Sequence, residues 1–497
     1  MLFTRESGIL LPVSALPGRF GIGDLGPGAQ AWLDFVAATR TRWWQVLPLG
    51  PTGYGDSPYA SYSSFAGNPD LISPELLVQD GLLDEAHWQS APSFSGERVN
   101  YQLVHYWKRS LFQVAYLRLK DHAQLQADFD AFRQEQSGWL DNYTLFMALK
   151  DQEAELPWSA WPAGVRDRRP EALAEARQIH AATISFYAFE QFLFFRQWSA
   201  LRARAGELGI GIIGDLPIYV SEDSADVWAA RELFEIDEAG KPLRVAGVPP
   251  DMFSETGQRW GNPLYRWETH KQQGYAWWLA RLQAVLSLVD VLRLDHFRGF
   301  ANYYAIPADE PTAVHGTWEF GPGADFFETV RERLGNLPLI AEDLGGEGEP
   351  IVTSLRDRFH LPGMRVFQFA FDTDMDHIFL PHNYPVNCVA YTGTHDNDTV
   401  VGWFAKAPES ERRFCLEYLN SNGIHVAWDM LHSLWASPAA LTVAPIQDFL
   451  EFGTEARFNL PGTSLGNWAW RLDGDLLTAD LAARIAALNA EGERAVG

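Results

Sequence analysis

Four short apolar runs in the chain end in carboxylate side chains, and two of these ends also carry a histidine. The four ends read GDLPIYV (214–220), RLDHFRG (293–299), AEDLG (341–345) and THDN (394–397). A single aspartate at the end of a strand most often caps the next helix. Four such ends that also supply Arg293, His296 and His395 exceed what capping needs. The pattern therefore favours an active site built from carboxylates.

Several carboxylates suit the chemistry of glycosidic bonds. One carboxylate attacks or stabilises the anomeric carbon, and a second, protonated one donates to the leaving oxygen; a separation of about 5–5.5 Å favours the retaining pathway. The 20 Trp, 31 Phe and 16 Tyr residues are numerous enough to supply flat faces for sugar rings as well as a core. Mg²⁺-dependent phosphoryl transfer or enolisation is the weaker alternative, because the sequence has no Walker-type loop and its acidic strand ends alternate with His and Arg.

Composition bounds the class of protein. A length of 497 residues, 47% hydrophobic and 21% charged, indicates a folded chain with room for roughly three domain-sized units or one large barrel. The formal charge of -25 repels polyanions, so we expect no nucleic acid and no membrane among the partners. Two cysteines cannot build a disulfide framework, which favours a reducing, cytoplasmic location.

No metal site is expected. The sequence has no HExxH pair and no Cys/His cluster. Its nearest approach to an EF-hand loop is Asp372–Asp376, where His377 stands in place of the turn glycine and Asn383 in place of the bidentate glutamate. We therefore expect no cofactor and activity without a metal ion.

Strands and helices must place these side chains together, and apolar runs alternating with helical patterns provide them. Near-continuous apolar runs of this length are typical of parallel strands buried on both faces. Amphipathic patterns such as 274–286 and 325–334 lie between most of them. Eight strands alternating with helices predict an α/β fold, a (β/α)8 TIM barrel, whose reactive groups lie at the carboxyl ends of the strands. The runs are Gly8–Ser14, Trp43–Gly50, Ile210–Asp215, Val289–Asp295, Leu337–Glu342, Met364–Ala370, Cys388–Thr394 and Ala440–Pro445.

Uneven spacing predicts insertions into this barrel. About 160 residues separate the second run from the third, far more than one crossover helix needs. Residues 74–204 are expected to form a mainly helical subdomain, and residues 221–270 a mixed subdomain that acts as a lid. The rest of 1–497 is expected to form one catalytic barrel unit. About 50 residues follow the last run, too few for a C-terminal β-domain.

The four motifs, in this order, resemble the strand-end regions of the α-amylase superfamily. Three further stretches are similar to the amylomaltase family, the bacterial 4-α-glucanotransferases, and the resemblance runs from about Gly8 to Trp468. It implies the same barrel and the transfer of α-1,4-glucan segments to the 4-hydroxyl of another glucan or of glucose. The stretches are GIGDLG (21–26), YGDSPYAS (54–61) and GVPPDMFSETGQRWGNP (247–263).

The resemblance also implies residue roles. Asp295 matches the nucleophile that carries the glucosyl group, Glu342 the general acid/base, and Asp396 the carboxylate that holds the distorted donor sugar. Arg293 lies two residues before Asp295, so both side chains should share one face of a strand, where the guanidinium would keep the carboxylate ionised. Glu342 should have a raised pKa relative to Asp295, since it must start protonated.

Further positions match substrate contacts. His296 and His395 correspond to imidazoles that bind sugar hydroxyls, and Asp215 to a carboxylate that supports the site. The other contacts implied are Ser57 and Tyr59 near the cleavage point, Asp251, Gln258 and Trp260 in a lid, Asp372 on the donor side, and Tyr54 at a second glucan site.

The implied partners are α-1,4-glucans, namely maltooligosaccharides, amylose and fragments of starch or glycogen, with glucose as an acceptor. Two alternatives remain at this stage. An α-1,4-glucan hydrolase would use the same residues with water as acceptor, and a non-catalytic glucan-binding protein would keep the barrel without turnover. Chain-length preference, ring size of cyclic products and oligomeric state are not encoded in any motif.

Overall fold

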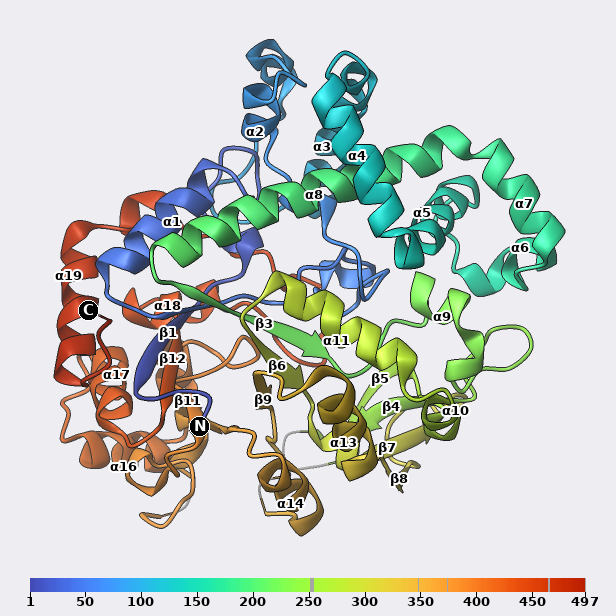
Figure 1. Cartoon of the computed structure of the whole chain (residues 1–497). Helices are drawn as coiled ribbons and strands as arrows, with labels where there is room; N and C mark the ends of the chain where they lie inside the picture. Colours follow the sequence, from blue (N-terminus) through green and yellow to red (C-terminus); the bar gives the residue numbers. More distant parts are fainter. Residues whose placement is uncertain (251–253, 347, 373, 464, 497) are drawn as a thin grey trace.

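A parallel sheet of eight strands forms the centre of the molecule (Figure 1). The computed structural model describes residues 1–250, 254–346, 348–372, 374–463 and 465–496. The sheet order is β10-β11-β12-β1-β2-β3-β6-β9, with every neighbouring pair parallel. A backbone hydrogen bond from Ala341 N to Pro362 O (2.9 Å) links the two outer strands, so the sheet is a nearly closed barrel. The predicted (β/α)8 fold is confirmed. The strands are β1 (Glu6–Leu10), β2 (Trp43–Gln45), β3 (Gly211–Pro217), β6 (Val291–Asp295), β9 (Leu339–Ala341), β10 (Gly363–Val366), β11 (Cys388–Tyr391) and β12 (Leu441–Pro445).

Each predicted run overlaps its strand, but the bounds differ: β1 begins two residues before its run, β10 begins one residue before its run, and β3 continues two residues beyond its run. Other runs extend past the end of their strand. Strand β2 stops at Gln45, and β10 stops at Val366, where the chain continues as the 3-10 helix η7 (Phe367–Ala370). Leu47 and Ala370 are nonetheless buried. An apolar run reports burial and not backbone conformation, which is why these two predicted strands were too long at their carboxyl ends.

Helices surround the barrel (Figure 1). The C-terminal helix packs against the first helix and α17, and Asn489 fixes it by accepting from Trp435 Nε1 (2.7 Å) and donating to Thr39 O (2.9 Å). In the described residues after β12 there are helices and one isolated bridge, Arg98 to Trp470, but no strand. The helices around the barrel are α1 (Pro27–Ala38), α11 (Ala276–Leu288), α13 (Gly323–Leu334), α14 (Pro350–Arg358), α15 (Val400–Lys406), α16 (Glu409–Leu419), α17 (Val426–Ala436), α18 (Ile446–Phe449) and α19 (Ala479–Glu491).

The chain between β2 and β3 is the helical insertion expected from its length, and it rises above the barrel in Figure 1. Its longest helix, α8, leads back into β3 and packs against three others, α3, α4 and α5. Buried Lys108 ties the insertion to the barrel by donating to Asp24 Oδ2 (3.1 Å), Asp70 O (2.8 Å) and Ile72 O (2.9 Å). The helices are α2 (Pro74–Gln79), α3 (Tyr101–Leu119), α4 (Ala123–Glu135), α5 (Ser137–Gln152), α6 (Ala163–Arg166), α7 (Pro170–Ile179) and α8 (Ala181–Glu207).

A second, antiparallel sheet of order β5-β4-β7-β8 lies beside the barrel. Strands β4 (Arg244–Val248) and β5 (Gln258–Pro263) belong to the mixed insertion that was expected after β3, which also holds α9 (Ala225–Ala229) and α10 (Trp267–Gln272). The other two strands, β7 (Asn302–Pro307) and β8 (Thr317–Phe320), come from a third insertion between β6 and β9, after the short helix α12 (Arg298–Ala301), that the sequence did not reveal. The assignment of 74–204 and 221–270 as separate subdomains stays a prediction. None of the helices in the described ranges has the length and apolarity to cross a membrane.

Candidate active site

The carboxylates of the four predicted strand ends lie at the carboxyl end of the barrel. Strand β3 carries Asp215, β6 ends in Asp295, Glu342 follows β9 directly, and Asp396 follows β11. Because these strands are parallel, their carboxyl ends meet at one mouth, where barrel enzymes build their sites. The four motifs of the sequence thus form one cluster.

Arg293 links two of these carboxylates from a buried position. Its Nη1 donates to both oxygens of Asp215 (2.8 and 2.7 Å) and to Asp295 Oδ1 (2.8 Å), while its Nε lies 3.4 Å from Met364 Sδ. Burial raises the pKa of Asp295 to about 6, and the Arg293 charge offsets this only in part. Asp215 shares the guanidinium, and its negative charge adds to the rise in the pKa of Asp295.

Glu342 is buried and fixed by two backbone groups. The His296 N–H donates to Oε2 (2.6 Å) and the Leu344 N–H to Oε1 (2.9 Å). Burial raises the pKa of Glu342 well above its ordinary value; Arg293 and the His296 N–H act against this rise, and the negative charge of Asp295 adds to it. The environment of Glu342 therefore favours the protonated form more than that of an exposed carboxyl group does.

Asp396 has the opposite electrostatic setting. Burial acts to raise its pKa, but His395, whose Nε2 lies 3.2 Å from Oδ2, and Asn459, whose Nδ2 donates to Oδ1 at 2.6 Å, together bring the pKa of Asp396 below its usual range. Arg457 donates to the Asp396 backbone carbonyl (2.5 Å). Asp396 thus stays a carboxylate across the pH range in which Asp295 and Glu342 titrate.

Tyr59 connects the two halves of the cluster. Its hydroxyl donates to Asp215 Oδ2 (2.7 Å), and its ring stacks on His395 with 5.0 Å between centroids and an interplanar angle of 21°. Trp468 packs against both rings, at 5.7 and 5.8 Å. The tyrosine therefore fixes the orientation of His395 relative to the Arg293 network.

The small sheet brings the predicted lid to this mouth. Trp260, on β5, meets His296 edge-on with 4.9 Å between ring centroids, and its Nε1 donates to Gln258 Oε1 (3.1 Å). His296 has a left-handed backbone (φ 50°), which turns its N–H toward Glu342, and burial lowers its pKa to about 4. His296 is therefore neutral at pH 7. Asp251 lies outside the described residues.

Among the predicted contacts in the described residues, Asp372 and Tyr54 have no hydrogen bond, ion pair or ring contact to the cluster, and Ser57 reaches it only through Tyr59. Asp372 is half-exposed, with its Oδ1 3.4 Å from His377 Nε2. The Ser57 hydroxyl accepts a hydrogen bond from Tyr59 N (3.2 Å), so it contacts a residue of the cluster. Tyr54, in the 3-10 helix η2 (Tyr54–Asp56), is 81% exposed.

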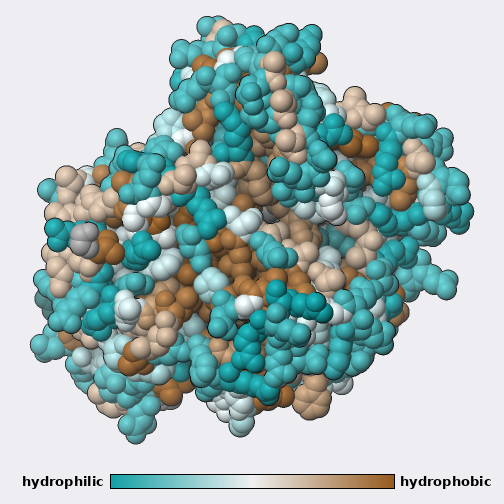
Figure 2. Space-filling view, viewed as in Figure 1, coloured by the Kyte–Doolittle hydropathy of each residue, from teal (hydrophilic) through white to brown (hydrophobic). Residues whose placement is uncertain are grey.

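Two cavities adjoin the cluster. The larger, about 700 Å³ including its open mouth, runs along β3 and α11 and has Tyr59 and Asp215 in its wall; Figure 2 shows apolar residues gathered in a hollow on this face. The smaller, about 490 Å³, is lined by Asp56, Tyr101 and Trp468 among others, and so borders the loop that carries Tyr54. In the described part of the chain, no three His, Cys, Asp or Glu side chains group as a metal site.

Sequence reasoning missed four residues that shape the cluster: Met364, Arg457, Asn459 and Trp468. The last three follow β12 in a loop that returns over the barrel mouth. A signal was available, because any loop after a barrel strand lies at the carboxyl end, but nothing in the sequence indicates which of its polar side chains reaches Asp396.

Fold and site together define a class: a barrel enzyme whose mouth gathers four carboxyl groups, an arginine and two histidines, with the pKa of a glutamate raised and that of an aspartate lowered. A family model described as 4-alpha-glucanotransferase matches residues 11–478. The 4-alpha-glucanotransferase of Thermus thermophilus is 49% identical over 99% of this chain and 100% of its own. That of Synechocystis sp. is 47% identical over 96% of this chain and 95% of its own. The chain therefore belongs to the 4-alpha-glucanotransferase family, as the resemblance predicted, and it is an enzyme of glucan transfer.

Solved structures agree with this assignment. The amylomaltase from Streptococcus agalactiae in complex with acarbose superposes with a TM-score of 0.96 and 37% identity, covering 99% of this chain and 100% of that one. The amylomaltase from Corynebacterium glutamicum, at 18% identity and a TM-score of 0.74 over 97% of this chain and 75% of that one, shares the fold.

Proposed function

We propose that the chain transfers α-1,4-glucan segments by a retaining, double-displacement route in which Asp295 is the nucleophile, Glu342 the acid/base and Asp396 the carboxylate that holds the donor sugar. One observation supports these roles above others: the three carboxylates share one mouth yet have different protonation settings. A raised pKa in Glu342 and a lowered one in Asp396 match the division of labour that the reaction needs.

In the first step, an Asp295 oxygen attacks the anomeric carbon of the donor sugar while Glu342 gives its proton to the glycosidic oxygen. The bond between that carbon and oxygen breaks, and the reducing-end fragment leaves with a free 4-hydroxyl. Arg293 donates to Asp295 Oδ1 at 2.8 Å, so it orients the attacking carboxylate. The donor segment is now bonded to Asp295.

In the second step, the 4-hydroxyl of another glucan, or of glucose, attacks the same carbon. Its proton passes to the Glu342 carboxylate, and the bond to Asp295 breaks, which restores both groups. Two inversions at one carbon give net retention.

The remaining polar groups position the donor sugar. Asp396 and His395, held by Asn459 and by Tyr59, present a carboxylate and an imidazole for adjacent hydroxyls. Neutral His296 presents a second imidazole. Asp215 acts through Arg293 and Tyr59 and not on the sugar.

The lid decides between transfer and hydrolysis. Trp260 reaches His296, so a glucan bound at the mouth is covered by an aromatic ring and the glycosyl-enzyme is shielded from water. Gln258 accepts a hydrogen bond from the Trp260 indole and so helps to orient it. Asp251, Ser57 and Asp372 are proposed as further contacts to the glucan.

The proposed substrates are maltooligosaccharides, amylose and fragments of starch or glycogen, with glucose as an acceptor and Tyr54 at a second glucan site. The proposed location is the cytoplasm, and nucleic acid and membranes are not among the proposed partners, on the basis of the -25 charge and the two cysteines.

Incubation with maltotriose tests the function. A ladder of longer maltooligosaccharides is expected from the wild type, with no ladder from Asp295→Asn or Glu342→Gln. Rising reducing ends without a ladder would establish a hydrolase instead, and binding without turnover a glucan-binding protein. Full activity of Asp295→Asn would refute the nucleophile assignment.

A further inference from the structure

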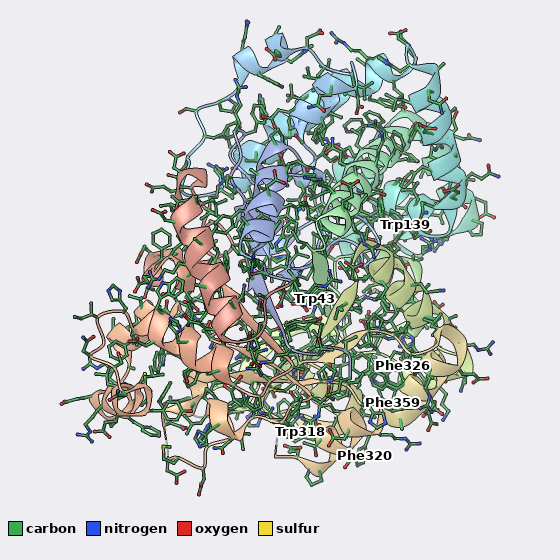
Figure 3. The ribbon with its side chains drawn as sticks, turned by 60° about the vertical axis from the view of Figure 1, so that its left-hand side comes forward. Trp43, Trp139, Trp318, Phe320, Phe326 and Phe359 are labelled. Atoms are coloured by element: carbon green, nitrogen blue, oxygen red, sulfur yellow. The ribbon has the colours of Figure 1, made fainter. Side chains whose placement is uncertain are left out.

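Two aromatic side chains stand out on the edge strand of the small sheet, away from the described cluster. Trp318 is 41% exposed and Phe320 is 80% exposed, both on β8, which is the outer strand of the order β5-β4-β7-β8. They lie two residues apart and oppose Tyr304 and Asn302 on β7, so they share one face of the sheet. Figure 3 shows both labelled at the same edge of the molecule.

Trp318 is held as a fixed platform. The Arg298 guanidinium lies over its ring at 3.9 Å, and Tyr304 meets it edge-on with 5.3 Å between centroids. Arg298 is itself buried and anchored by Asn302 Oδ1 (3.1 Å) and Glu349 Oε1 (2.7 Å). One face of the Trp318 ring is therefore covered, and these contacts hold the indole in its partly exposed position.

The same arginine connects this surface to the active site. Arg298 Nη1 donates to Gly345 O (2.6 Å), three residues after Glu342, and Arg298 lies two residues after His296. Trp318 is thus linked through Arg298 to the Glu342 side of the mouth. That is the side on which the leaving fragment departs and the acceptor arrives, because Glu342 is the group that exchanges protons with both.

We propose that Trp318 and Phe320 form an outer platform for the acceptor glucan, beyond the sugars that contact Glu342; this inference rests on the proposed residue roles. A glucan is neutral and has apolar ring faces with hydroxyl rims, which suits two exposed rings beside the polar Arg298 and Glu349 pair. The alternative occupant, a second copy of the chain, is disfavoured by the -25 charge of each copy.

Acceptor length is the variable to test. Amylose serves as a saturating donor, and the acceptor is either labelled glucose or maltohexaose labelled at its reducing end. A labelled molecule becomes longer only when it acts as the acceptor, so the label in longer products measures acceptor use. We expect Phe320→Ser to raise the KM for maltohexaose roughly three- to tenfold, the worth of one aromatic contact, and to leave the KM for glucose unchanged. Trp318→Ala should act in the same direction.

Tyr106→Ser is the matched control, because Tyr106 is exposed on α3 in the helical insertion. It should leave both KM values unchanged. An unaltered maltohexaose KM in Phe320→Ser, or an equal rise for glucose, overturns the platform. A fall in molar mass on light scattering with unaltered KM values would instead identify a surface between two copies of the chain. If the wild type forms no ladder from maltotriose, the proposed function itself is refuted, whatever the KM values of the variants show.

Discussion

Asn459→Ala should weaken catalysis through Asp396 without unfolding the protein. The amide donates to Asp396 Oδ1 at 2.6 Å, and a hydrogen bond to a charged group contributes about 1.5–3 kcal/mol. The Asp396 side chain is 44% exposed, so water replaces part of the lost hydrogen bond. We therefore expect the substitution to cost about 1–2 kcal/mol of transition-state stabilisation. This corresponds to a fall of roughly 5–30-fold in kcat/KM for maltotriose disproportionation.

A pH profile separates this role from a structural one. Asn459→Asp places a second carboxyl group beside Asp396, and like charges raise the pKa of the pair, so the acid limb of kcat/KM should shift to higher pH. Asn467→Ala is the control: among the described residues, the Asn467 side chain hydrogen-bonds to Thr463 and Leu460 of the same loop and not to the cluster. If Asn467→Ala loses as much activity as Asn459→Ala, or if the profile of Asn459→Asp keeps its wild-type shape, the reasoning is wrong.

Three further outcomes are expected. The kcat/KM of the wild type should fall as pH drops through about 6, because Asp295 must be ionised and its pKa is raised to that value; an acid limb near pH 4 would contradict this. Trp260→Ala should increase the ratio of hydrolysis to transfer, measured as reducing ends against ladder products from maltotriose, since water then reaches the glycosyl-enzyme; Tyr106→Ser, on the exposed face of α3, serves as the comparison. Lys108→Ala should lower the free energy of unfolding by about 3–5 kcal/mol in a denaturant titration, because it leaves Asp24 buried without its cation; a loss below 1 kcal/mol would show that water compensates.

The barrel was predictable because its signal is local. Each parallel strand is a largely apolar run, such as Leu339–Ala341, and a reactive side chain follows directly at its end, as Glu342 does. Since parallel strands all point the same way, reading the strand ends was enough to find the carboxylate cluster. The lengths of the strands were less predictable, because residues such as Leu47 and Ala370 are buried outside any strand.

The small sheet was not predictable in the same way. Its strands come from 244–263 and from 302–320, on either side of β6, and neither segment contains a signal for the other. Pairing between β4 and β7 joins them across more than 50 residues. The lid and the proposed acceptor platform therefore belong to one sheet, which the division of the sequence into insertions had separated.

The sequence, read with its resemblance to a known family, thus predicted the fold class, the glucan-transfer chemistry and the three carboxylates proposed for catalysis. Only the tertiary structure decided their protonation settings and their partners. Arg293 is shared between Asp295 and a residue 78 positions away, and Asp396 is held by an amide 63 positions away. The physical reason is that burial and hydrogen bonding depend on what surrounds a side chain in space, whereas a strand pattern is written in neighbouring residues.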